Sequence, residues 1–187
     1  PEPGFLAQLA KLGPVRWLVA PNNFHYAHLP AWAEHFPKAQ VHAAPGVAER
    51  AAGHGVTFPP HELLGDDAPP DWQGVIDQRL VPGHPVLNEV IFFHRPSRVL
   101  ILSDLIENFE GPRLRWPMRL AARLAGNLAP DGKAPIDMRL SWRNKPAARA
   151  VIDEVIGWAP EQVVMAHGRI YRENAVAELR RAFRWLG

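Results

Sequence analysis

The chain has 187 residues, of which 47% are hydrophobic, and a formal net charge of +2. This length and composition predict a globular chain with a sizeable core and exclude a disordered or collagen-like protein. Cysteine is absent, so a metal could be held only by His, Asp or Glu. The small net charge gives no reason to expect a nucleic-acid partner, and no apolar run is long enough for a membrane span. A cytoplasmic location is the default expectation.

The first third of the chain alternates short predicted helices and strands. Hydrophobic spacing predicts helices over residues 4–13, 30–36 and 45–53, the second of them with Pro30 in its first turn. Apolar runs predict strands over residues 15–20 and 39–44. Residues 53–74 are rich in Gly, Pro and Asp, which indicates a long surface loop.

The rest of the chain contains longer apolar segments. Strands are predicted over residues 75–81, 88–94 and 98–104, and the turn at residues 95–97 joins the last two as a hairpin. A helix over residues 112–128 is expected to break at Pro117, and a second helix to end at Gly157. A strand at 161–168 precedes a closing helix whose Leu179, Phe183 and Leu186 face the core. Alternating helices and strands predict one layered α/β domain over residues 1–187.

Four short motifs place His or Asp at strand ends. They are "NFHYAH" with His25 and His28, "PGHP" with His84, "LSDL" with Asp104 and "MAHG" with His167. Polar groups that follow buried strands lie at the rim of a sheet, so four such motifs predict one convergent site. Imidazole and carboxylate are ligands that zinc, iron and manganese accept. The alternative is that each residue only fills a turn or caps a helix.

The order of these motifs resembles the metallo-β-lactamase superfamily, whose members carry H-x-H-x-D-H, then Gly-His, Gly-Asp and a late Gly-His. The resemblance runs from Leu18 to Gly168. It is closest to a bacterial and plant branch of unknown activity, which shares "APN" before the histidines and "EVIFFHRPSR" before the Asp. It implies an αββα sandwich, with two sheets face to face and helices outside. Only 22 residues precede Asn23, so we expect N-terminal strands to be missing or trimmed.

The resemblance also implies which residues would bind metal. One ion would take His25 and His84, a second would take His28 and His167, and Asp104 would bridge them. We prefer the half-site of His28, His167 and Asp104, because "PGHP" is a plausible turn in its own right.

Two departures from the family motif weaken this site. Asn23 stands in place of the first His and Ala27 in place of the Asp, so each half-site loses one ligand. With one carboxylate left for two ions, we expect at most one zinc, iron or manganese ion, or an empty pocket.

The resemblance implies a metal-dependent hydrolase, in which a metal-bound hydroxide attacks an ester, thioester, amide or phosphodiester of an unknown small molecule. The alternative is a catalytically degenerate protein of the same fold that acts as a binding or scaffolding domain, as Asn23 and Ala27 suggest. Glu89 is interpreted as an exposed strand residue in preference to a partner of the site. Four arginines form a basic edge that could meet a membrane surface or an anionic ligand, although a solvated face is preferred: Arg113, Arg115, Arg119 and Arg123.

Overall fold

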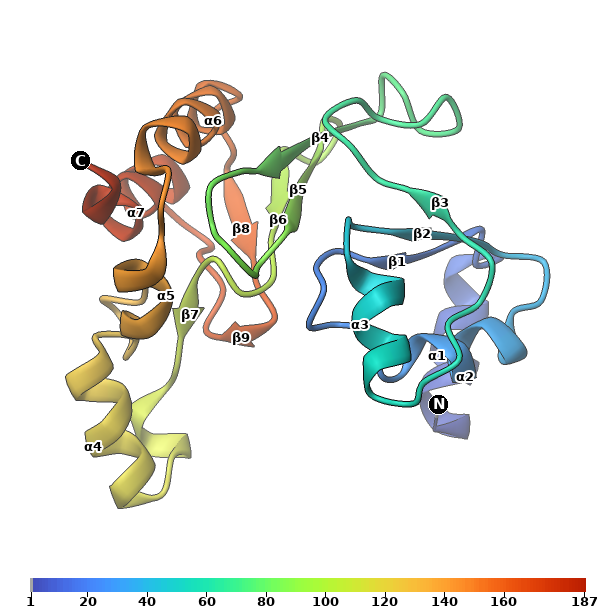
Figure 1. The fold of residues 1–187 in the computed structure, drawn as a ribbon, viewed down its shortest axis with the longest axis horizontal. Coiled ribbons are helices and arrows are strands. Elements are labelled where there is room, and N and C mark those ends of the chain that lie inside the picture. The colour runs from blue at the N-terminus through green and yellow to red at the C-terminus, as the bar shows by residue number, and fades with distance from the viewer. Residues whose placement is uncertain (1) are drawn as a thin grey trace. The chain divides into compact units, whose positions relative to one another are not determined.

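The computed structural model describes residues 2–187, which form two compact units, residues 2–64 and residues 65–187 (Figure 1). Each unit has its own sheet and helices. No helix within residues 2–187 is long and apolar enough to cross a membrane. The expectation of a single domain over residues 1–187 stays a prediction.

The first unit is a small parallel sheet with three helices. Strands β1 (Trp17–Ala20), β2 (Gln40–Ala43) and β3 (Glu62–Leu63) lie in the order β1-β2-β3. Parallel neighbours need a crossover, and α2 (Leu29–His35) and α3 (Val47–Gly53) supply the two. Helix α1 (Pro3–Leu12) precedes β1. The predicted helices and strands of this unit are confirmed, and β3 is a short addition inside the predicted loop.

The second unit is built on a mixed four-stranded sheet. Its strands are β4 (Ile76–Val81), β5 (Glu89–His94), β6 (Val99–Ile101) and β8 (Gln162–Val164), in the order β4-β5-β6-β8. The predicted hairpin is confirmed, because β5 and β6 pair antiparallel with His94 opposite Val99. The next pair, β6 and β8, is parallel. Five of the six residues of β5 are buried, as its continuous apolar run indicates.

A second, two-stranded sheet was not predicted. Strand β7 (Glu107–Asn108) pairs in parallel with β9 (His167–Gly168). The strand predicted over residues 161–168 is therefore divided into β8 and β9, with Met165 and Ala166 between them.

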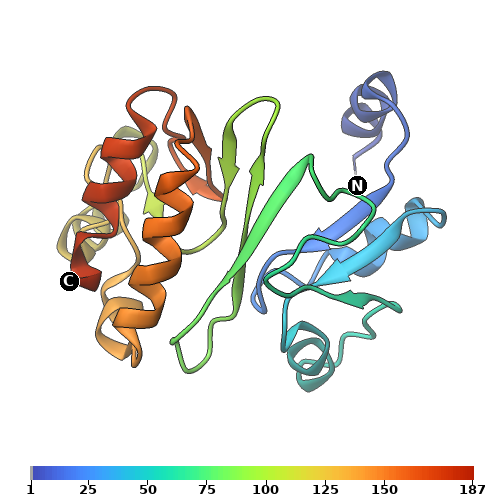
Figure 2. The same ribbon diagram turned by 90° about the horizontal axis from the view of Figure 1, so that it is seen from above.

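Helices α6 (Lys145–Gly157) and α7 (Ala175–Ala182) lie on one face of the four-stranded sheet (Figure 2). The side chain of Asn144 caps α6 by accepting the N–H of Ala147. The predicted core residues of the last segment are buried, namely Leu179, Phe183 and Leu186. They join the strand residues in one hydrophobic core.

The segment between β7 and α6 holds η1 (Gly111–Arg113), α4 (Trp116–Ala125) and α5 (Ile136–Ser141), and η2 (Arg184–Leu186) closes the chain. The segment predicted as a helix over residues 112–128 is interrupted as expected, but at residues 114–115, and Pro117 is the second residue of α4. Proline fits the first turn of a helix, where its missing N–H leaves no bond unmade.

Candidate metal centre

Asp104 lies in a buried turn directly after β6. Glu89, at the start of the neighbouring strand β5, accepts the backbone N–H of Ser103 at 2.7 Å and that of Asp104 at 2.9 Å. Glu89 is completely buried, so its interpretation as an exposed strand residue is wrong. Two hydrogen bonds to one carboxylate fix the backbone from which the Asp104 side chain extends.

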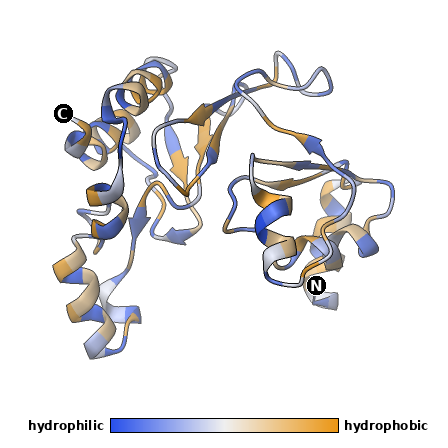
Figure 3. Cartoon of the chain, viewed as in Figure 1, coloured by the Kyte–Doolittle hydropathy of each residue, from blue (hydrophilic) through white to orange (hydrophobic). Residues whose placement is uncertain are grey.

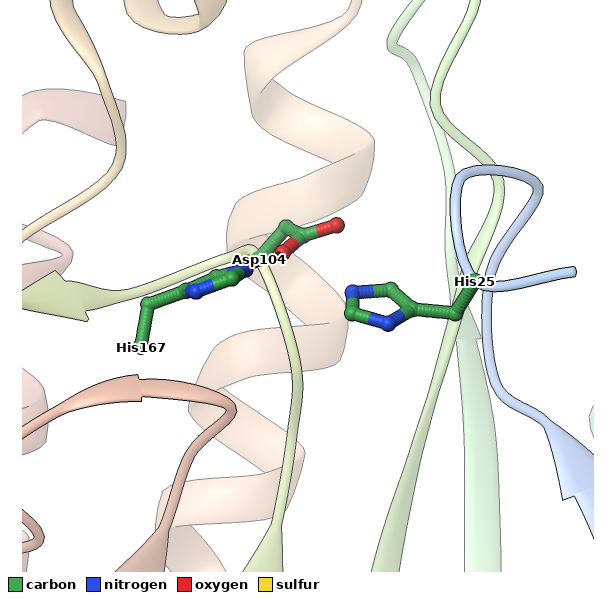
Figure 4. Close-up of side chains that lie close together, drawn as sticks. All are labelled: His25, Asp104 and His167. Carbon is green, nitrogen blue, oxygen red and sulfur yellow. Dashed lines mark ion pairs between the residues drawn. The ribbon is translucent and has the colours of Figure 1, made fainter. Parts of the chain in front are cut away.

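His167 reaches the same turn from β9. Its Nε2 lies 2.9 Å from Oδ1 of Asp104, and Figure 4 shows the two side chains side by side. The imidazole is 39% exposed, whereas the Asp104 side chain is 11% exposed. The structure therefore brings together two of the predicted ligands from separate strands, with the imidazole open to solvent.

Gly168 allows β9 to approach β7 this closely. Its φ is +101°, and a Cβ atom at this position would lie 2.0 Å from the carbonyl oxygen of Asn108. Asn108 also donates from Nδ2 to the carbonyl oxygen of Arg169 at 2.7 Å. The glycine of the "AHG" motif thus sets the position of His167 through the backbone.

Glu107 is a further acidic residue of this region that the sequence analysis missed. It is the β7 residue opposite His167 in the β7–β9 register, and its Oε2 accepts a hydrogen bond from Nδ2 of Asn127 at 2.6 Å. Burial raises the pKa of the Glu107 carboxyl and the charge of Asp104 acts in the same direction, while Asn127 and His167 oppose the rise. The only sequence signal is its place three residues after Asp104.

His84 makes its own local contacts in the second unit. Its Nδ1 accepts the N–H groups of Val86 at 3.2 Å and Leu87 at 2.7 Å. Nε2 therefore carries the proton and donates to Oγ of Ser141 at 2.9 Å. Burial lowers the pKa of His84, against a smaller opposing effect of Asp137. One ring nitrogen bonds within the turn and the other bonds to Ser141 of α5, and a metal contact of His84 stays a prediction.

His25 and His28 lie in the first unit, in the turn between β1 and α2. The completely buried Asn22 accepts the N–H groups of Phe24 at 2.9 Å and His25 at 3.2 Å on its Oδ1. His28 is exposed and stands at the N-cap of α2, where its carbonyl oxygen accepts the N–H of Trp32. Both imidazoles line a pocket of about 540 Å³ in this unit.

The Asp104–His167 pair fits a metal ion by donor type and by spacing. Zinc accepts imidazole nitrogen and carboxylate oxygen at about 2.0–2.2 Å, so two ligands of a tetrahedral ion stand roughly 3.4 Å apart. The observed separation of 2.9 Å needs only a small opening to reach that value. The pair alone is two ligands, so a stable site needs a third.

Solved structures similar to this chain share one fold. The metallo-β-lactamase FIM-1 from Pseudomonas aeruginosa, in its mono-zinc form, is 14% identical with a TM-score of 0.62, and the match covers 97% of this chain and 70% of that one. The chain has the metallo-β-lactamase fold. The predicted fold class is confirmed. Metallo-β-lactamases from Hirschia baltica (13% identity, TM-score 0.60, 97% and 73% covered) and Pontibacter korlensis (14%, 0.62, 98% and 75%) also share this fold.

Of the comparisons with known proteins, only that with solved structures finds a match. No protein-family model matches the chain, and no curated protein matches it by sequence. At 10–14% identity these solved structures establish the fold, and the chemistry has to be argued from the side chains.

Proposed function

We propose that this protein is a metal-dependent hydrolase that binds a single zinc ion through Asp104 and His167 of the second unit. The observation that carries the proposal is the Asp104–His167 pair, which lies after β6 and in β9 of a metallo-β-lactamase fold. The buried Glu89 supports it, because it fixes the Asp104 turn as neighbouring groups commonly do behind metal ligands.

The remaining ligands of the ion stay predictions of the sequence. His25 and His28 lie in the first unit, and His84 bonds within the second, so each is tested by substitution.

A bound zinc ion would supply Lewis acidity and an activated water. The protein groups would hold the ion in place and transfer protons beside it. Asp104 and His167 would hold the ion, and Glu107, whose pKa is raised, would exchange a proton beside them. A pocket of about 610 Å³ begins at Gly168, next to His167, and its lining includes two arginines, Arg169 and Arg172, and three glutamates, Glu110, Glu173 and Glu178. A lining with both charges does not select the charge of the substrate, whose cleaved bond would be an ester, thioester, amide or phosphodiester.

Zinc content tests the proposal directly. The untagged full chain is dialysed against a fixed zinc concentration and analysed for metal by mass spectrometry, beside Asp104→Asn, His167→Ala, His25→Ala, His28→Ala and His84→Ala. We expect about one equivalent on the wild type and at least tenfold weaker binding for Asp104→Asn and His167→Ala. Loss of zinc from His25→Ala, His28→Ala or His84→Ala would identify that histidine as a further ligand. His94→Ala is the matched control, because its imidazole bonds to Ser97 at the β5–β6 turn.

Hydrolysis is measured separately on nitrophenyl esters and phosphodiesters, with and without zinc. Zinc-dependent turnover that His167→Ala abolishes supports the hydrolase. Zinc binding that survives both Asp104→Asn and His167→Ala contradicts the ligand set. A chain that binds no zinc supports the second candidate, a degenerate binding or scaffolding domain, which the replacements Asn23 and Ala27 favour.

A further inference from the structure

Helix α4 is almost entirely exposed, although it is amphipathic. Of its ten residues only Ala122 is buried. Four large apolar side chains of α4 are exposed: Trp116 is 78% exposed, Met118 59%, Leu120 50% and Leu124 74%. Single exposed apolar residues need no explanation, but a contiguous set of large ones marks a binding surface.

Three of these four apolar residues form a stripe with a basic row beside it, and Met118 faces another side of the helix. Trp116, Leu120 and Leu124 are spaced four residues apart, so they follow one side of the helix. Arg119 and Arg123 have the same spacing one residue earlier, and both are exposed. Figure 3 shows hydrophobic and hydrophilic residues alternating along α4. We call the three residues of the stripe and the two arginines the α4 surface.

Positive charge around the α4 surface is not neutralised by the protein. Residues 111–130 contain four arginines and no Asp or Glu. Within the described residues 2–187, only Arg113 of these four has an ion pair, with Glu110 at 3.2 Å. The remaining three, which include both arginines of the α4 surface, are therefore available to anionic groups of a partner.

We propose that the α4 surface binds the anionic lipid headgroups of a membrane, with α4 lying in the plane of the interface. Its low overall hydrophobicity, exposed Trp and Leu stripe and adjacent Arg row are the features of interfacial helices. The acyl boundary would take the apolar stripe and the phosphates would take the arginines. A purely apolar protein partner would leave Arg119 and Arg123 without counter-charges.

The size of the electrostatic contribution can be stated in advance. Each Arg near an anionic bilayer strengthens binding about fivefold, so removal of two weakens it roughly thirtyfold, and reversal of their charge weakens it further. Removal of the two leucines reduces the buried apolar area without changing the charge. Loss of binding in both variants separates an interfacial helix from simple charge attraction.

The test is co-sedimentation of the full chain with phosphatidylcholine vesicles, with and without phosphatidylglycerol. Three double variants are compared: Arg119→Glu with Arg123→Glu, Leu120→Ser with Leu124→Ser, and the control Arg180→Glu with Arg184→Glu. The control pair has the same spacing and exposure in another part of the unit. Circular dichroism checks that each variant is folded.

We expect binding only to the vesicles with anionic lipid, weakened by salt, lost in the first two variants and kept in the control. An equal loss of vesicle binding in the control variant would show that binding does not depend on α4 in particular. No binding of the wild type would overturn the proposal. So would a concentration-dependent dimer, detected by light scattering without vesicles, that the leucine variant abolishes, because the occupant would then be a second copy.

Discussion

Replacement of Glu89 by Gln tests whether this residue fixes the Asp104 turn. Both oxygens of Glu89 accept a backbone N–H, which is the bonding of a carboxylate. The Gln amide keeps one acceptor and turns a donor toward the other N–H. The loss of one charge-assisted hydrogen bond and the burial of an unsatisfied N–H together lower the free energy of unfolding by about 2–4 kcal/mol. Stability of a domain is only about 5–15 kcal/mol, so the effect should be large.

The assay is urea unfolding of the zinc-free full chain, followed by tryptophan fluorescence. Glu161→Gln is the control, because Glu161 is 68% exposed and pairs with Arg98 at 3.0 Å on the surface. Such exposed pairs contribute about 0–1 kcal/mol. We expect Glu89→Gln to lower the unfolding midpoint strongly and Glu161→Gln to change it little.

The same variant has a second readout in zinc affinity. If Glu89 orients Asp104, the affinity falls about 10–100-fold in protein that is still folded. A Glu89→Gln chain that is no less stable than Glu161→Gln would refute the assigned role of these hydrogen bonds. A destabilised chain with unchanged zinc affinity would keep the structural role and remove the link to the metal.

Three further predictions concern the glycine, the turn histidine and the lost carboxylate. Gly168→Ala should destabilise the protein by at least about 1–3 kcal/mol in urea unfolding through its positive φ and its contact with β7, whereas Gly157→Ala, with open space around it, should not. Burial lowers the pKa of His84 in the folded state. Its contribution to the free energy of unfolding is therefore fully present when the pH is above the pKa of the unfolded chain, about 6.5, and is lost as the pH falls below that pKa. Urea unfolding of zinc-free protein at several pH values should show the free energy of unfolding falling as the pH is lowered, and His84→Ala should reduce this pH dependence. Ala27→Asp should raise zinc content above one equivalent, and two equivalents on the wild type would contradict the one-metal proposal.

The sequence predicts the parts of this fold that have a local pattern. The apolar run of β5 and the spacing of Leu179, Phe183 and Leu186 each reveal a buried element. The polar residues that follow strands also mark Asp104 and His167 as candidate ligands from the sequence alone. These signals depend on neighbours within a few residues, so a single sequence contains them.

The parts that the sequence misses depend on non-local contacts. Strands β7 and β9 have two residues each, too few for a period, and their pairing joins Glu107 to His167 across the chain. Glu89 is misjudged from sequence because an acidic residue in a strand is usually exposed, and only the fold supplies its partners Ser103 and Asp104. Helix α5 is missed because it spans only six residues.

Two turns that carry predicted ligands are built in the same way. Asn22 accepts two consecutive N–H groups before the His25 side chain, and Glu89 accepts two consecutive N–H groups at Asp104. Burial of each polar side chain costs free energy of desolvation, and its hydrogen bonds fix one backbone conformation. A binding scaffold does not require a fixed backbone at such a turn, whereas a metal ligand does. The ligand motif is degenerate at Ala27. The groups that position the remaining ligands, Asn22 and Glu89, are nevertheless present, and this favours the hydrolase over the scaffold.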